Sequence, residues 1–290
     1  MTRRRVALAT YSKLPELAPD DHPLIPALGA LDIAVEPAVW DDDAKSWNGF
    51  DAVVVRSCWD YHLRIGRFLG WLAALESVGV PVINAARLLR WNADKRYLLE
   101  LAARGIDIVP TRLVPRGAPL TLVQVLTELD LNEAVVKPAV SASAHSTWRT
   151  GLRRAEADEA RFRSLVAAGD VLVQPLLAEV VETGEWSLVC FGGQPSHAVL
   201  KRPAQGDWRV QGELGGSAEI LPAPSGLAES AARILDAAGA GGSTYARVDG
   251  CMVDGRFRLM ELELIEPQLY LGLEPCAPGR FAAAIAAALP

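Results

Sequence analysis

Two glutamates separated by a single residue, near the C-terminal end of the sequence, constrain this chain most. Glu261 and Glu263 alternate with apolar residues, and a period of two is typical of a β-strand. The apolar residues are Met260, Leu262 and Leu264, which would pack against the core. Adjacent carboxylates raise each other's pKa unless a cation lies between them. Because Mg²⁺ commonly binds one or two carboxylates together with nucleotide phosphates, this strand predicts a metal–nucleotide site.

The composition is that of a soluble enzyme. Half of the 290 residues are hydrophobic, which is enough to bury a large core in two or three domains. The net charge of −6 argues against nucleic acid or an anionic membrane as a partner. The four cysteines show no CxxC spacing, which favours reduced thiols. We find no signal peptide or membrane span in the sequence and expect a cytoplasmic protein.

The hydrophobic pattern predicts three units. Residues 1–88 alternate short buried strands with an amphipathic helix, as in an α/β domain with a parallel sheet. Residues 89–178 combine helical patterns with short strands. In residues 179–290 the pattern becomes hairpins, with a Gly192-Gly193 turn between two expected strands. We therefore expect an α/β domain that binds substrate, followed by two α+β subdomains, of which the second holds the metal site.

Common nucleotide motifs such as GxxxxGK[ST] and GxGxxG are absent, so phosphate binding would need lysines and a different loop. Lys95 lies at the expected start of a helix, where an ammonium and the helix N-terminus can share an anion. Lys137 ends an expected strand. The run of small and hydroxyl residues that follows, including Ser141 and Ser143, is suited to wrapping phosphate with backbone N–H groups.

Residues suited to the nucleoside follow in chain order. Gln174 ends an expected strand and Leu176 lies two residues later, so this segment could give adenine an apolar slot and backbone hydrogen bonds. Glu185, directly after Gly184, could accept hydrogen bonds from the ribose hydroxyls. With the two lysines and the carboxylate strand, these residues account for each part of an ATP molecule.

The order of these segments resembles that of the ATP-grasp superfamily, in particular the glutathione-synthetase-like carboxylate–amine ligases. The resemblance extends from the first strand to about Leu271. The matching segments are 82–84, 92–95, 136–138, 173–175, 184–185, 199–203, Arg209 with Gly215-Gly216, 248–249 and 261–263. The resemblance implies an ATP-grasp fold, in which an N-terminal α/β domain is followed by two α+β subdomains that clasp ATP.

The same resemblance implies a role for each residue. ATP would be bound by Lys95, Lys137, Ser141, Ser143, Gln174, Leu176 and Glu185. Two Mg²⁺ ions would be bound by Asp249, Glu261 and Glu263. The cations facing the γ-phosphate and the acyl phosphate would be the catalytic residues Lys201, Arg202 and Arg209.

Three positions depart from the glutathione synthetases. Glu263 stands where those enzymes carry asparagine, and Ser187 stands where they carry arginine. The resemblance therefore does not imply glutathione synthesis. The loop after Lys137 has no glycine, although many relatives are glycine-rich there, so we expect a stiffer loop.

In such ligases the substrate carboxylate attacks the γ-phosphate, which gives an acyl phosphate and ADP, and an amine-type nucleophile then displaces phosphate. Catalysis is mostly positioning and charge neutralisation, so no side-chain nucleophile is needed. We expect a small amino-acid-like substrate and either ligation or ring closure, as in the cyclo-ligase of cycloserine biosynthesis. A non-catalytic ATP-binding module and a kinase-like enzyme are the alternatives. A homodimer or homotetramer is expected by analogy only.

Substrate contacts are expected from Arg56, Ser57 and Asp60, where the second parallel strand should end. Ligands of open α/β sheets bind at that edge. Arg56 is a natural bidentate partner for a substrate carboxylate, and Asp60 could hold an amino group. Alternatively, Arg56 could pair with Asp60 in a structural salt bridge.

The metal hypothesis depends on the register of one hairpin. A two-residue Asp254-Gly255 turn with straight strands would place Asp249 and Glu261 on opposite faces. A three-residue loop that also includes Val253, with a glycine bulge, would place them on the same face. We predict the three-residue loop.

Overall fold

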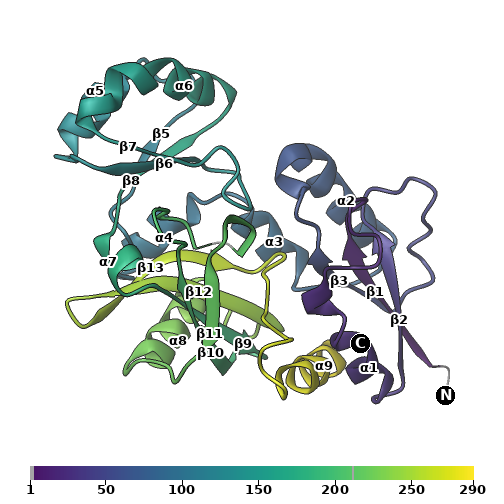
Figure 1. The fold of residues 1–290 in the computed structure, drawn as a ribbon. Helices are drawn as coiled ribbons and strands as arrows, with labels where there is room; N and C mark the ends of the chain where they lie inside the picture. The colour runs from purple at the N-terminus through teal and green to yellow at the C-terminus, as the bar shows by residue number, and fades with distance from the viewer. Residues whose placement is uncertain (1–2, 211) are drawn as a thin grey trace.

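The computed structural model describes residues 3–210 and 212–290, and within these residues the chain forms three β-sheets covered by helices (Figure 1). The N-terminal sheet is parallel, with the strand order β2-β1-β3-β4. Its strands are β1 (Arg4–Thr10), β2 (Ile33–Val39), β3 (Ala52–Ser57) and β4 (Val82–Ile83). Short 3₁₀ helices follow β1 and β3: η1 (Pro19–Asp21) and η2 (Tyr61–Arg64).

Helices cover both faces of this parallel sheet, as such sheets require. On one face α2 (Ile65–Ser77) inserts Phe68 and Leu72, which repeat with helical spacing. The other face packs against α1 (Leu24–Gly29) and α9 (Ala277–Ala288), which lie side by side in Figure 1 although they come from opposite ends of the chain. The C-terminal helix therefore helps to stabilise the N-terminal sheet.

The second sheet is antiparallel, with the strand order β5-β8-β6-β7. Its strands are β5 (Arg112–Val114), β6 (Ala134–Pro138), β7 (Trp148–Thr150) and β8 (Val171–Pro175). The 3₁₀ helix η3 (Leu152–Arg154) precedes α6 (Ala155–Ala168), which packs beside α5 (Leu122–Glu128) in the core of this sheet. A capping box formed by Thr121 and Gln124 begins α5.

The third sheet has five strands in the order β11-β10-β9-β12-β13. The strands are β9 (Glu185–Phe191), β10 (Gln194–Arg202), β11 (Ser217–Ile220), β12 (Tyr245–Val253) and β13 (Arg256–Glu263). Its helices are α7 (Ala178–Glu182), η4 (Gly212–Leu214) and α8 (Leu227–Ala237). The buried side of α8 packs against this sheet in one continuous core.

Two helices join the first sheet to the rest of the chain. The helix expected from about residue 94 to 103 is α4 (Tyr97–Ala103), which begins a few residues later than expected, and a further helix that was not predicted, α3 (Ala86–Asn92), precedes it. Leu98 and Leu101 of α4 belong to the core of the five-stranded sheet, whereas Leu89 of α3 belongs to the core of the N-terminal sheet. The break between the helices places Lys95 in a turn. No helix of the described residues is long and apolar enough to cross a membrane.

Candidate active site

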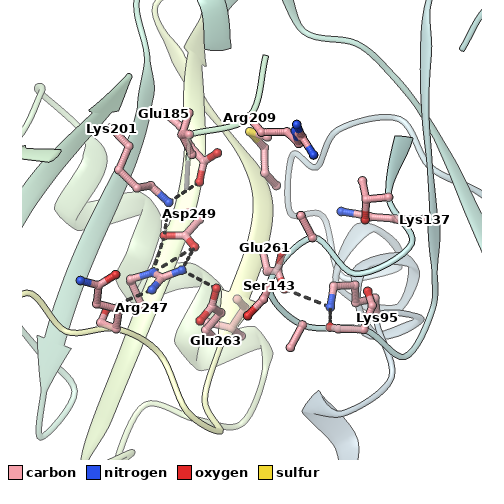
Figure 2. Close-up of a pocket in the computed structure, with 18 of the residues that line it drawn as sticks. Lys95, Lys137, Ser143, Glu185, Lys201, Arg209, Arg247, Asp249, Glu261 and Glu263 are labelled. Atoms are coloured by element: carbon pink, nitrogen blue, oxygen red, sulfur yellow. Dashed lines mark hydrogen bonds and ion pairs between the residues drawn. The ribbon is translucent and has the colours of Figure 1, made fainter. Parts of the chain in front are cut away.

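A pocket of about 550 Å³ is lined by residues from the regions of all three sheets. Most of the predicted site residues line it: Lys95, Lys137, Ser141, Ser143, Gln174, Leu176, Glu185, Lys201, Arg209, Asp249, Glu261 and Glu263. Figure 2 shows the carboxylates between the cations Arg247 and Lys201 on one side and Lys95 and Lys137 on the other. The described residues that line the pocket do not include four of the predicted site residues: Arg56, Ser57, Asp60 and Arg202.

The turn of the β12–β13 hairpin differs from the predicted one. It has two residues, Asp254 and Gly255, with φ values of 49° and 75°, so the predicted three-residue loop is wrong. The Asp-Gly pair adopts the left-handed conformations that two-residue hairpin turns require. Such a turn with straight strands would place Asp249 and Glu261 on opposite faces.

A bulge elsewhere in the hairpin restores the shared face. The register shifts by one residue next to Gly250, so Asp249 pairs directly with Glu261 and Met260 is the extra residue. Met260 therefore lines the pocket beside Glu261 and packs against a small cluster around Cys251, whereas Leu262 and Leu264 pack in the main core as expected. A Cβ atom on Gly250 would lie 2.2 Å from the carbonyl oxygen of Arg258, so glycine is required at this close approach.

Asp249 is the most deeply buried of the three predicted metal ligands, at 2% exposure. Arg247 donates hydrogen bonds to both of its carboxylate oxygens, and the Ser187 hydroxyl donates at 2.5 Å. The Lys201 ammonium lies 3.7 Å away. Although burial opposes ionisation, Arg247 and Lys201 lower the pKa of Asp249 to about 2. This carboxylate is therefore ionised at neutral pH.

The other two carboxylates each have a cationic partner. Glu261 lies 3.1 Å from the Lys95 ammonium, which, against the effect of burial, lowers its pKa. Glu263 forms an ion pair with Arg247. Burial raises the pKa of Glu263 to about 7, and the neighbouring Asp249 and Glu261 add to this because they repel its charge.

The described residues contain no group of three or more His, Cys, Asp or Glu side chains gathered closely enough to hold a metal ion. The three carboxylates nevertheless share a face and offer the hard oxygen donors that Mg²⁺ prefers. Each is instead neutralised by a neighbouring lysine or arginine. The donor set fits Mg²⁺ in chemistry, and its use as a metal site stays a prediction.

Lys95 connects the carboxylate strand to the loop after β6. Its backbone N–H donates to the carbonyl oxygen of Ala139 at 2.8 Å, and its ammonium donates to the carbonyl oxygen of Ser141. The Ser141 hydroxyl in turn donates to the carbonyl oxygen of Pro138. Lys95 is only 6% exposed, so this ammonium is fixed between the loop and Glu261.

Lys137 lies in β6 and faces the same pocket, where burial lowers its pKa. The loop of residues 139–147 follows and contains no glycine. Three of its residues, Ser143, Ala144 and Ser146, have φ values of 49°, 52° and 54°. Glycine adopts this region freely, whereas other residues lose about 1 kcal/mol or more each. The loop thus takes glycine-like conformations without glycine.

The residues predicted for the nucleoside line one part of the pocket. The Gln174 side-chain amide donates to the Thr111 hydroxyl at 2.8 Å, and Leu176 contributes an apolar surface. Glu185 is 9% exposed and receives a hydrogen bond from Lys201. Burial raises the pKa of Glu185, and the Lys201 ammonium opposes this rise. The Lys201 ammonium therefore lies between Glu185 and the metal-ligand candidate on β12.

The two predicted catalytic arginines lie in different environments. Arg209 lines the pocket, pairs with Asp207 at 2.9 Å and lies over the Trp208 ring. Arg202 is exposed at the end of β10 and lies 3.7 Å from Glu219. Neighbouring residues of a strand point to opposite faces, so Lys201 faces the pocket and Arg202 points away.

Arg56 and Ser57 form a buried cluster with Asp21. Two nitrogens of the Arg56 guanidinium donate to Asp21, at 2.9 and 2.8 Å, and the Ser57 hydroxyl donates to its other oxygen at 2.8 Å. Arg56 also donates to the carbonyl oxygen of Pro267 at 2.8 Å. The guanidinium thus has protein partners and is 1% exposed, which places it behind the pocket wall instead of in the pocket.

Asp60 is likewise occupied by protein groups. It accepts a hydrogen bond from the Trp40 indole at 2.9 Å and pairs with Arg64. The alternative of a salt bridge between Arg56 and Asp60 is therefore wrong. Arg56 forms its salt bridge with Asp21, and Asp60 pairs with Arg64.

Sequence reasoning missed the most connected cation of the site. Arg247 lines the pocket and holds both Asp249 and Glu263. It lies two residues before Asp249 in β12, and this alternation could have identified it. Other lining residues that were not predicted are Asp20, Trp59, Trp208, Glu266, Gln268 and Tyr270.

Comparisons with known proteins identify the family. A family model described as the N-terminal domain of D-cycloserine synthetase DcsG matches residues 6–84. The cycloserine biosynthesis protein DcsG of Streptomyces lavendulae is 32% identical over 282 residues, which cover 92% of this chain and 93% of that protein. The chain belongs to the DcsG family of ATP-grasp ligases. The expected ATP-grasp fold and ligase activity are confirmed.

Solved structures agree with this membership. The crystal structure of D-cycloserine synthetase DcsG matches this ligase with a TM-score of 0.88 and 30% identity, over 99% of this chain and all of that one. The D-alanine–D-alanine ligase of Bacillus anthracis complexed with ATP has a TM-score of 0.71 at 16% identity, covering 98% and 96% of the two chains. At that identity the second match supports the fold alone.

Proposed function

We propose that this ligase uses Mg-ATP to activate the carboxylate of a small amino acid as an acyl phosphate, and that a nitrogen nucleophile of the same molecule then closes a ring. The observation that carries the proposal is the group of three carboxylates, Asp249 of β12 and Glu261 and Glu263 of β13, on one face of the sheet between two groups of cations. Oxygen donors flanked by ammonium and guanidinium groups suit a metal–triphosphate complex.

Different residues of the pocket would bind different parts of ATP. Lys95 and Lys137 would bind the triphosphate, and the 139–147 loop would cover it. Gln174, Leu176 and Glu185 would hold the nucleoside. Two Mg²⁺ ions bound at the carboxylates would neutralise the phosphate charge.

The remaining cations would act on the transferring phosphoryl group. Lys201 and Arg247 lie beside Asp249, and Arg209 lines the same pocket; these three cations would orient the γ-phosphate and stabilise the charge that develops on it. Arg202 points away from the pocket, so we do not assign it to this step.

The proposed substrate class follows from the product that the relatives' names specify. Cycloserine is a five-membered ring closed by an N–C(=O) bond, and it carries a free amine. Hydrolysis of that ring bond gives β-aminooxy-D-alanine. In the proposed reaction its carboxylate attacks the γ-phosphate and releases ADP, the aminooxy nitrogen attacks the acyl carbon, and phosphate leaves as the nitrogen loses a proton. No further reactant is needed.

The first experiment is thermal unfolding with and without Mg-ATP, followed by an assay of ADP release with β-aminooxy-D-alanine. A ligand at 100 times its Kd stabilises a protein by about 2.7 kcal/mol, which should raise the Tm by several degrees. ADP release that depends on the amino acid, with formation of the ring, supports the proposal. ADP release without ring formation would indicate a kinase-like enzyme instead.

Replacing one metal-ligand candidate tests the site directly. We expect Glu261→Gln to reduce the rate of ADP release by roughly 100-fold or more, because it removes a preorganised charge at the reacting phosphates. The matched control is Glu229→Gln, an exposed residue of α8, which should leave the rate unchanged. Equal rates for the two variants would exclude Glu261 from the site.

A further inference from the structure

The segment of residues 264–272, hereafter the anchored segment, follows β13 and has an unusual set of hydrogen bonds. Six consecutive carbonyl oxygens, from Leu264 to Leu269, each lie within hydrogen-bond distance of a side chain from another part of the described chain. Those side chains are, in order, Asn84 at 3.0 Å, Tyr245 at 2.8 Å, Trp59 at 3.3 Å, Arg56 at 2.8 Å, Arg247 at 2.9 Å and His197 at 2.9 Å.

Backbone N–H groups of the same segment are also held by side chains. Leu264 donates to the Asn92 side chain at 2.8 Å. Leu269 and Gly272 donate to the two oxygens of Asp20, at 3.1 and 3.3 Å. The segment therefore depends on side chains from the N-terminal domain and the five-stranded sheet, and it has a fixed shape without being a helix or strand.

The anchored segment presents Ile265, Glu266, Gln268 and Tyr270 to the pocket. These residues follow Glu263 directly in the chain, so they lie next to the carboxylates proposed to hold the metal, whereas the adenine residue Gln174 lies on β8 of another sheet. A rigid backbone that lines the end of a binding pocket is suited to holding a small substrate in one orientation.

Glu266 differs from the other acidic residues of this pocket. Within the described residues, each of the other lining acids has a hydrogen-bond or ion-pair partner: Asp20, Glu185, Asp249, Glu261 and Glu263. The carboxylate of Glu266 has none in that part of the chain. Burial raises its pKa well above the usual value, and the charge of Glu263 adds to this effect.

A partly buried carboxylate without a partner is costly, and a bound cation would remove that cost. On the same wall, Arg247 pairs with Asp249 and Glu263, and it would be able to attract an anion once Mg²⁺ binds these two carboxylates. An amino acid carries both charges on one carbon atom, so its carboxylate can lie toward the cations while its ammonium lies toward the unpaired acid.

We propose that Glu266 binds the α-ammonium group of the amino-acid substrate, and that the anchored segment fixes this carboxylate relative to the site of phosphoryl transfer. The inference rests on the proposed ring-closing function and adds a residue that selects for the amine. It also gives Arg56 a role as a positioning residue, since it holds the carbonyl next to Glu266 from behind the pocket wall.

The test compares two acids that differ only in the amine: β-aminooxy-D-alanine and 3-aminooxypropionic acid. Wild-type enzyme should show a kcat/KM for the amino acid roughly 10- to 100-fold higher than for the acid without the amine, as expected for a charged hydrogen bond. Glu266→Gln should lose most of this ratio, mainly through a higher KM for the amino acid, and keep its turnover of the other acid. Glu266→Asp, which keeps the charge, should recover part of the ratio.

Several outcomes would overturn the inference. Equal kcat/KM values of the wild type for the two acids, or an unchanged ratio in Glu266→Gln, would exclude Glu266 as the ammonium site while leaving the ligase function intact. If the wild type converts neither acid although Mg-ATP raises its Tm, the proposed ring closure itself is wrong. The Tm shift of Glu266→Gln with Mg-ATP verifies folding, and Glu229→Gln is the matched control on the surface.

Discussion

Two irregular segments line the same pocket and are held in different ways. The 139–147 loop follows the strand that carries Lys137. The hydrogen bonds at its tip are made within the loop: the backbone N–H of His145 donates to the carbonyl oxygen of Ala142, and that of Thr147 donates to the carbonyl oxygen of Ala144. The anchored segment has side chains from distant parts of the chain at six consecutive carbonyl oxygens. The tip of the loop is therefore suited to move, although Lys95 holds the start of the loop, and the anchored segment is fixed.

This difference matches what each segment would have to do. A loop over a triphosphate must open to admit the nucleotide and release ADP, so weak attachment is an advantage. A segment that selects a small substrate must keep a carboxylate in one place, and preorganisation improves both binding and selectivity. Local contacts therefore distinguish the two segments although both lack regular secondary structure.

The largest effect should come from removing an anchor. Arg56→Met deletes the hydrogen bond to Pro267 and leaves the buried Asp21 without its cation, which typically costs about 3–5 kcal/mol. We expect a lower free energy of unfolding in urea and a higher KM for the amino acid. The 139–147 loop should be unaffected, so Mg-ATP should still raise the Tm of the variant.

Arg67→Met is the control for this variant. Arg67 belongs to the same domain, its side chain is 44% exposed, and it pairs with Asp43, whose side chain is 94% exposed. Surface pairs contribute about 0–1 kcal/mol, so this change should be mild. Equal losses of stability in the two variants would mean that the buried cluster of Arg56 is not an anchor.

The effect of intermediate size concerns the pH dependence of the contact between the 139–147 loop and His62. The His145 ring in the loop lies 5.1 Å from the ring of His62 in η2, and both ring nitrogens of His62 are buried without a hydrogen-bond partner in the described chain. Burial, together with the charge of His145, lowers the pKa of His62 to about 4. An exposed histidine has a pKa near 6.5. The contact between the His62 and His145 rings is therefore fully stable above about pH 6.5.

As pH falls from 6.5 toward 4, the open loop binds more protons than the closed one, so the contact weakens. We expect amide hydrogen exchange in the 139–147 loop, corrected for intrinsic rates, to be faster at pH 5.5 than at pH 7.5. The anchored segment should not change. His62→Phe should abolish the pH effect on the loop, and an equal effect in that variant would show that His62 is not responsible.

The smallest effect concerns backbone strain in the loop. Ala144 has a φ of 52°, a backbone conformation that is strained for alanine and not for glycine. In Ala144→Gly the relief of this strain roughly offsets the greater flexibility of glycine in the unfolded chain. The free energy of unfolding should therefore change by less than about 0.5 kcal/mol. Ala142 has no such φ and packs against the N-terminal core. Ala142→Gly should therefore destabilise by about 0.5–1 kcal/mol. Thermal unfolding compares the two, and a larger loss for Ala144→Gly would contradict the strain argument.

Much of the fold could be predicted because its elements have strong local signals. The apolar run before Arg56 predicted the buried strand β3, and Thr121 with Gln124 begins the expected helix α5. Short elements such as β7 and α7 were missed because a few residues carry little periodicity. The helix predicted to begin near Lys95 begins at Tyr97 instead, and the backbone N–H of Lys95 donates to the carbonyl oxygen of Ala139, a distant contact that the sequence does not reveal.

The sequence by itself determined the chemistry of the pocket. Alternation in a strand places Glu261 and Glu263 on one face whatever surrounds them, and Lys95 and Lys137 were found from local patterns, whereas Lys201 came from the family resemblance. The family resemblance ordered these pieces along the chain, and the comparisons confirmed the family.

Only the tertiary structure decided which residues face the pocket and which stand behind it. The bulge at Met260, and not the turn, sets the register of Asp249, because one extra residue reverses the face of a strand. Arg56 is an anchor instead of a substrate ligand because Asp21, far from it in sequence, completes its ion pair. Glu266 is conspicuous only because its carboxylate has no partner among the described residues, and the partners of a side chain depend on contacts between distant segments.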